Sequence, residues 1–408
     1  MDSAFFQPLS GLHALSSHAR PWPEFTDENF RRLGMQRVLE AAESGRAFLH
    51  AHGVRFEHTP GHSNYCAALQ RERRRNVRRH VPSALLTTAN LTRPDRLAEI
   101  PELAAYDGFA TDGHCHKAAT PDARHDGCKL AVGPCYSLNL RTHTLRHLAA
   151  GEGWPEHDLS ALKRITPRRL RQGVARGRRG WLVHDKAGID FDYWQRCRKE
   201  RAVYFLSRVK ENRVYAWTRS GLWDRADARN HGVTDDRRAT TREGHELRIV
   251  GYTDPVRGER IEFPTNVLAL PPGVSVELYR RRWEAEKVFD EIKNKLGEKK
   301  AWAPRLEAKE TPPLRIAITH NLLGCSEAEW AWQPGVSNAA EDRRRAKRAE
   351  TLGQACVKKG TPLSTLVLQA RRATQRSVKC GRWLRQSLRA HAAEAAAVLR
   401  LKALYANL

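Results

Sequence analysis

The chain has 408 residues, and its 71 lysines and arginines outnumber 46 aspartates and glutamates, a formal net charge of +25 that favours a polyanionic partner such as nucleic acid. It contains no run of about 18 apolar residues and no charged-then-apolar signal pattern at its start, so we expect a cytoplasmic protein without a membrane segment. The eight cysteines are scattered without a CxxC pair, which argues against a disulfide framework and favours reduced thiols.

The first hundred residues are predicted to be helical. Residues 25–52 have the spacing of an amphipathic helix with Thr26 as its N-cap, and residues 63–80 predict a second helix rich in arginine. Three basic patches are candidates for contact with phosphates, although one of them is expected to be only a solvated basic face: residues 71–79, 163–179 and 343–348.

Residues 106–116 (YDGFATDGHCH) contain two Asp-Gly pairs. Asp107 and Asp112 are five positions apart, so on an extended strand their side chains face opposite ways, and only one of them can enter a given site. The dipeptide alone most often marks a turn. Residues 129–133 and 136–142 have the composition of strands that follow.

Residues 181–194 (WLVHDKAGIDFDYW) predict a short buried strand, then Asp185, then the start of a helix. A β-rich segment at 202–210 comes next and ends in cations. About a hundred residues separate Asp185 from Glu286, too many for a simple loop. Because residues 213–217, 246–253 and 259–263 alternate like strands, we expect a β-rich insertion at about 210–265.

Residues 276–297 (VELYRRRWEAEKVFDEIKNKLG) predict one amphipathic helix that follows a Pro-Pro-Gly break at 271–273, begins at an N-cap at Ser275 and ends at Gly297. Four reactive side chains fall on one stripe at about 100° per residue, namely Tyr279, Arg282, Glu286 and Lys293. The apolar residues beside the stripe are expected to face the core, namely Leu278, Ala285, Phe289, Ile292 and Leu296. A carboxylate flanked by cations suits metal-assisted phosphoryl transfer. A solvated face held by i,i+4 ion pairs is the alternative.

The tail from about 331 to 408 is predicted to be helical and basic, and it ends in the strong helix former HAAEAAAVLRLKALY. Its sequence matches no motif that would assign it a role. A helical cap on the core is the simplest interpretation.

The spacing Tyr279-x2-Arg282-x3-Glu286-x6-Lys293 resembles the YREK box of bacterial insertion-sequence transposases of the IS-four group, which belong to the DDE superfamily. In that family the glutamate is the third metal-binding carboxylate and lies on a helix of an RNase H-like domain. Trp283 after the arginine also fits the common YRxRW form.

Two upstream segments extend the resemblance. Residues 181–194 resemble the family's second-Asp motif through Asp185, Asp190 and Phe191, with Lys186 in place of the usual arginine and Gly188 in place of the usual aromatic residue. Asp112-Gly113-His114 resembles the DGH variant of the first-Asp motif, which implies that Asp112 is the first carboxylate and that Asp107 is a turn residue.

The resemblance implies an α+β fold with an α/β core, in which helices flank an RNase H-like mixed β-sheet. Its expected organisation is a helical DNA-binding region at residues 1–100, a catalytic domain at 101–330 interrupted by the insertion at about 210–265, and a helical basic region at 331–408.

The implied function is cut-and-paste transposition of an insertion sequence, with double-stranded DNA as the partner in the form of terminal inverted repeats and target DNA. By resemblance, Asp112, Asp185 and Glu286 hold two Mg²⁺ or Mn²⁺ ions, whereas Tyr279, Arg282 and Lys293 position phosphates. A homodimer assembled on DNA ends and a nucleoid-associated location are also implied. Two alternatives stay open: an inactive transposase-derived DNA-binding protein, and an RNase H-like nuclease that cleaves without joining.

Overall fold

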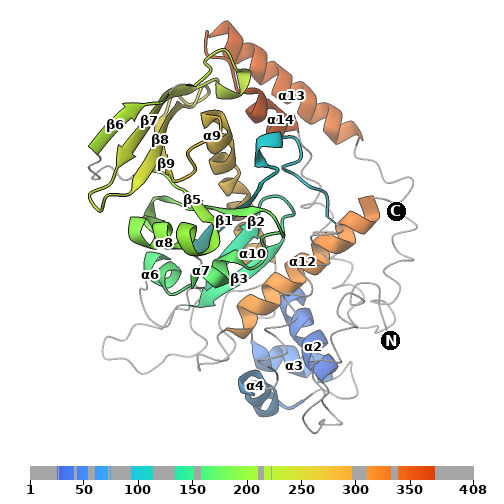
Figure 1. Ribbon diagram of the computed structural model, residues 1–408. Helices are drawn as coiled ribbons and strands as arrows, with labels where there is room; N and C mark the ends of the chain where they lie inside the picture. Colours follow the sequence, from blue (N-terminus) through green and yellow to red (C-terminus); the bar gives the residue numbers. More distant parts are fainter. Residues whose placement is uncertain are drawn as a thin grey trace, which may run out of the picture.

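The computed structural model of the protein describes residues 25, 27–40, 44–53, 60–71, 74, 93–113, 134–150, 158–209, 216–221, 223–295, 310–331 and 339–372. Within these ranges the strands form one mixed sheet with the order β3-β2-β1-β4-β5-β9-β8-β7-β6 (Figure 1). Helices cover both faces of this sheet, so the predicted α+β fold with an RNase H-like sheet is confirmed.

The first half of the sheet carries the two predicted aspartates. β1 (Tyr106–Gly113), β2 (Pro134–Asn139) and β3 (Leu145–Ala150) form an antiparallel meander. β4 (Arg179–Val183) and β5 (Val203–Leu206) then add to β1 in parallel. Their apolar residues are almost all buried, as expected for parallel strands that are covered on both faces.

The second half of the sheet is formed by the strands of the segment in which a β-rich insertion is expected. β6 (Ala216–Ser220), β7 (Val233–Thr240), β8 (Glu246–Thr253) and β9 (Arg260–Thr265) are antiparallel. The pair Leu206–Thr265 joins β9 to β5. Side chains reinforce this seam, because the Thr265 hydroxyl donates to the Phe205 carbonyl at 2.6 Å and Asn266 Oδ1 accepts from the Phe205 N–H at 2.9 Å.

Two groups of helices pack on opposite faces of the sheet, and the alternation of β1 shows which is which. Phe109 packs into a cluster with Trp194 of α8 (Phe191–Arg201), on the side where α6 (Asp158–Lys163) and α7 (Pro167–Arg171) also lie. Ala110 faces the other cluster. That cluster includes buried residues of α9 (Pro272–Arg280), α10 (Arg282–Lys295) and α12 (Thr311–Ala331). Three short 3-10 helices complete the described core: η2 (Pro101–Leu103), η3 (Lys186–Gly188) and η4 (Ala228–Asn230).

The amino-terminal helices differ from the sequence prediction. The helix expected over 25–52 is two helices, α2 (Asp27–Glu40) and α3 (Gly45–Gly53), and Thr26 lies outside the described residues. The second predicted helix is α4 (His62–Gln70), which ends because Arg71 has an extended backbone. A small hydrophobic cluster joins these three helices, and α2 packs against α12.

Buried arginines lie at the centre of this amino-terminal unit. Arg315 of α12 donates to the Phe30 carbonyl at 3.0 Å and to the Tyr65 hydroxyl at 3.3 Å. Arg74 lies over the rings of Phe25 and Phe30 at 4.7 and 4.5 Å. This arginine of the 71–79 patch is therefore part of the packing and does not face solvent.

The carboxyl-terminal region begins with α13 (Ala339–Lys358) and α14 (Thr365–Arg372), and residues 391–405 lie outside the described ranges. The two helices pack on the core beside α9 (Figure 1). Ser364 Oγ donates to the Arg229 carbonyl at 2.7 Å, and Leu366 is buried in the main core. In the described part of the chain, no helix combines the length and the apolar character needed to cross a bilayer.

Candidate active site

The strand register brings Asp112 and Asp185 to the same edge of the sheet. β1 and β4 are parallel neighbours, and Ala110 pairs with Val183. Asp112 lies two residues beyond Ala110, and Asp185 lies two residues beyond Val183. Since adjacent strands are about 4.8 Å apart, equivalent positions at their carboxyl ends are close together.

The two aspartates of β1 face opposite sides, as the odd spacing predicts. Asp112 is partly buried, and its Oδ1 accepts from the Gly113 N–H at 2.9 Å. Its other oxygen lies 3.9 Å from Nη1 of Arg282 on α10.

Asp107 is not a turn residue, and that prediction is wrong. It lies inside β1 and is 2% exposed. Its carboxylate accepts from Arg141 at 3.2 Å, from Arg178 at 3.0 Å and from the Ala175 N–H at 2.7 Å. The hydrogen bonds compensate the burial of this charge, so an Asp-Gly pair can occupy a strand interior.

The predicted helix over 276–297 is two helices with a break at Arg281. α9 begins at Pro272, directly after Pro271. Proline suits the first turn of a helix because the backbone N–H that it lacks has no partner within the helix there. Ser275 lies inside α9, fully buried, and is not the N-cap. α10 then runs from Arg282 to Lys295, and Gly297 lies outside the described residues. Four of the five residues predicted to face the core are buried, and Leu296 is not described: Leu278, Ala285, Phe289 and Ile292.

Arg282 connects two of the predicted carboxylates. Its Nη2 donates to Glu286 Oε1 at 2.7 Å, one helical turn along α10, and its Nη1 faces Asp112. Burial disfavours the charge on Arg282, but Tyr279, Glu286 and Asp112 outweigh it and raise its pKa above the ordinary value. The guanidinium is therefore a fixed cation between two of the three carboxylates.

Tyr279 and Asp185 complete the described part of the cluster. The Arg282 guanidinium carbon lies 5.8 Å from the centre of the Tyr279 ring, and this ring packs 4.6 Å from that of Phe263. Burial raises the pKa of Tyr279, and the charge of Asp185 acts in the same direction. Lys293 lies on α10, but its side chain is outside the described residues.

The segment around Asp185 is held by local hydrogen bonds. The Asp185 backbone carbonyl accepts from the Ser207 hydroxyl at 2.8 Å. The Asp190 carboxylate caps α8 by accepting from the Tyr193 N–H at 2.8 Å. Gly188 packs against His184, where an added Cβ would lie 3.2 Å from the His184 Cβ. The glycine that replaces the family's aromatic residue therefore fits against a histidine, which itself stacks on Trp194.

One ion pair and one hydrogen bond to a histidine position the α9–α10 junction, and the sequence analysis did not identify them. Glu277 is fully buried and accepts from Arg281 Nε at 3.0 Å; their i,i+4 spacing is a signal that could have indicated the pair. Glu284 bonds to Nε2 of His143 from the β2–β3 turn. Because 141 residues separate these two residues, no sequence spacing indicates this contact.

Among the described residues, no three His, Cys, Asp or Glu side chains gather closely enough to hold a metal ion. The site therefore consists of Asp112 and Glu286 on either side of Arg282, with Asp185 at the neighbouring strand end. Carboxylates beside a fixed cation are a combination that suits phosphoryl transfer.

Comparison with known proteins agrees with this chemistry. Residues 107–322, more than half of the chain, match the family described as the transposase DDE domain. The match starts in β1 and ends within α12, so it spans both aspartates, the insertion and the helix with Glu286. No curated protein matches the chain. The chain therefore belongs to the family of transposases with a DDE domain.

Proposed function

We propose that this protein is an active insertion-sequence transposase that binds terminal inverted repeats, cleaves the DNA at the element end and transfers the freed 3′ end to target DNA. The observation that supports the proposal is Arg282, which faces Asp112 of β1 and donates to Glu286 of α10, while Asp185 follows the neighbouring parallel strand β4. The finer assignment to the group with a YREK box rests on the four residues of that motif in the sequence.

The proposed roles rest on the contacts of the described side chains and, for Lys293, on its place in the sequence motif. Asp112, Asp185 and Glu286 are the catalytic carboxylates, and they would hold the divalent ions. Arg282, Tyr279 and Lys293 would orient the scissile phosphate, for which the Arg282 guanidinium supplies planar donors that match phosphate oxygens. Positioning of the reacting groups and stabilisation of the developing charge would then supply most of the rate enhancement, as is general for phosphoryl transfer.

The donor set fits Mg²⁺ or Mn²⁺. All three proposed ligands are carboxylates, which are hard oxygen donors, and the nearby His184 Nδ1 is engaged with the Thr111 hydroxyl. Asp112 and Glu286 already surround a cationic group, the Arg282 guanidinium, so this place favours positive charge. When bound, a pair of divalent ions would activate the attacking oxygen and stabilise the leaving one.

A cleavage assay on linear duplex DNA that carries the element's flanking inverted repeats tests the proposal. Wild-type protein with Mg²⁺ or Mn²⁺ should nick at the repeat end and join this end to a plasmid. Asp112→Asn, Asp185→Asn and Glu286→Gln should each lower the nicking rate by at least about 100-fold, since even outer-shell partners of metal ligands contribute about 10–100-fold. Asp290→Asn, on the exposed side of α10, is the matched control and should nick normally.

Other outcomes identify the alternatives. Tight repeat binding without nicking in either metal would assign an inactive DNA-binding derivative. Nicking without joining, and without preference for the repeat ends, would assign a nuclease. Formation of a homodimer on two DNA ends is part of the proposal, and native mass spectrometry of the end complex would measure it.

A further inference from the structure

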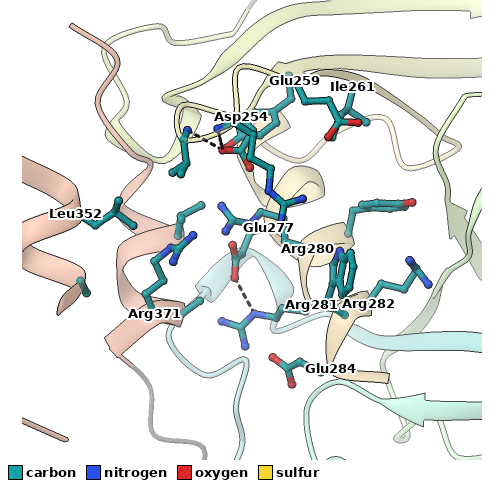
Figure 2. A pocket seen from close by; sticks show the side chains of 18 of the residues that line it. Asp254, Glu259, Ile261, Glu277, Arg280, Arg281, Arg282, Glu284, Leu352 and Arg371 are labelled. Atoms are coloured by element: carbon teal, nitrogen blue, oxygen red, sulfur yellow. Dashed lines mark hydrogen bonds and ion pairs between the residues drawn. The ribbon is translucent and has the colours of Figure 1, made fainter. Parts of the chain in front are cut away.

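A cavity of about 710 Å³ lies beside the candidate active site, at the meeting of three parts of the fold. The strands β8 and β9 of the insertion form one side, the α9–α10 junction forms the floor, and the carboxyl-terminal helices α13 and α14 form the opposite wall (Figure 2). Arg371 and Leu352 line the cavity from this wall, Arg280 lines it from the junction, and Arg282 lies at its edge (Figure 2).

The lining carries a surplus of positive charge. Several of its carboxylates already have cationic partners, such as Glu277 with Arg281 and Glu259 with Arg208. By contrast, four lining cations form no ion pair within the described ranges: Arg257, Lys287, Arg348 and Arg371. Because they come from four different elements and converge on one space, they suit a ligand with several separate negative charges.

The remaining lining is aromatic and aliphatic. Trp283 is 54% exposed and Val256 is 46% exposed, although large apolar side chains are usually covered. Nucleic-acid bases stack on such faces only when they are unpaired. The volume is also in the range of about 300–1,000 Å³ typical of sites for small ligands, which suits a short stretch of one strand.

The cavity and the proposed catalytic carboxylates share one residue, Arg282. This residue lines the cavity and also contacts Asp112 and Glu286. A phosphodiester at the carboxylates would therefore place the next nucleotides of the same strand near the cavity.

We propose that this cavity binds single-stranded DNA that continues from the scissile phosphodiester, with α13 and α14 supplying a phosphate-binding wall. This proposal rests on the proposed function, since it extends the path of the DNA strand from the catalytic carboxylates. It assigns a role to the 343–348 patch, because Arg345 and Arg348 face the lining. It also explains why α14 is anchored to the core through Ser364 and Leu366, since a binding wall must be fixed in place.

The test uses the full-length protein and a fluorescein-labelled oligomer of six deoxythymidines, with fluorescence anisotropy measured over a range of salt concentrations without divalent metal. The double variant Arg348→Gln/Arg371→Gln removes two cations of the wall. The matched control Arg343→Gln/Arg372→Gln removes the same charge from exposed positions on the same two helices, outside the lining. The first variant should bind the oligomer about tenfold more weakly. The slope of the logarithm of its binding constant against the logarithm of the salt concentration should be smaller by about 1.4, since each of the two lost phosphate contacts to a single strand contributes about 0.7. The control should bind like the wild type.

Three outcomes would overturn the proposal. The first is that the Arg348/Arg371 variant binds the oligomer with wild-type affinity. The second is that both variants lose the same affinity for the oligomer. The third is that hexaglutamate competes more strongly than the unlabelled oligomer, which would indicate an acidic peptide as the ligand. Repeat-end nicking is measured in parallel. If the wild type nicks normally and the Arg348/Arg371 variant binds the oligomer like the wild type, the proposed role of the cavity is rejected and the proposed function is kept. If the Arg348/Arg371 variant loses oligomer binding but the wild type never nicks, the proposed function is rejected and the binding role of the cavity is kept.

Discussion

Asp107 and Asp112 lie on the same strand, and because they are five positions apart their side chains point to opposite faces of the sheet. Asp107 is enclosed by arginines, so it behaves as a buried structural charge. Asp112 is partly exposed and faces α10. The sequence alone predicted the opposite orientations, but it could not predict that Asp107 is buried, because Arg141 and Arg178 lie far from it along the chain.

Substitution of each aspartate by asparagine should separate stability from catalysis. Asp107→Asn should lower the free energy of unfolding by about 3 kcal/mol, because it removes the buried carboxylate at Arg141 Nε and leaves this guanidinium only its pair with Asp95. The folded fraction of this variant should still nick DNA. Asp112→Asn should stop nicking and leave the unfolding midpoint unchanged. Urea denaturation and the nicking assay measure both effects, and an exchange of these results would make Asp107 the first catalytic carboxylate.

Among the helices and strands, those whose sequence pattern depends only on neighbouring residues were predicted best. The strand expected at 246–253 is β8 with the same bounds, because its alternation is regular. β7 was not predicted, since VTDDRRAT contains charged residues that only tertiary contacts explain; Asp236, for example, pairs with Arg248 of β8. The break at Arg281 also depends on a distant partner, because its side chain donates to the Arg96 carbonyl at 2.7 Å.

The seam between β5 and β9 should be sensitive to a single hydroxyl. Thr265 is fully buried, donates to the Phe205 carbonyl and accepts from the Val267 N–H at 3.1 Å. Thr265→Val keeps the shape but leaves Val267 N–H unpaired, so it should cost about 1–3 kcal/mol. Thr253→Val at the end of β8 is the control and should change stability by less than about 0.5 kcal/mol. Thermal unfolding measures both, and an equal effect of the two changes would contradict a special role for the seam.

For the whole molecule, buried histidines couple stability to pH. Burial is the main cause that lowers the pKa of four of them: His143 and His184 to about 4, and His147 and His320 to about 3. An unfolded histidine titrates near 6.5. Between about pH 4 and 6.5 the unfolded chain therefore binds protons that the folded chain does not bind, and stability falls as the pH falls through this window.

Chemical denaturation at a series of pH values should reveal this dependence. Each histidine contributes up to about 1.4 kcal/mol per pH unit, so the free energy of unfolding should decrease steeply from pH 6.5 to pH 4.5. His320→Asn should lower the number of protons taken up on unfolding by about one, and the free energy of unfolding should then depend less steeply on pH. A free energy that does not change over this interval would show that these histidines are not neutral in the folded protein.

The place of the insertion in the sheet has a consequence for how such proteins diversify. The chain leaves the core at β5 and returns at the adjacent strand β9, so the two ends of the insertion are about one strand spacing, ~4.8 Å, apart. The entropy of closing a loop rises only slowly with its length when its ends are fixed in this way. An insertion could therefore be lengthened, shortened or exchanged between relatives while α10 keeps its position. The carboxylates would be inherited with the core, and new contacts to DNA could be acquired separately.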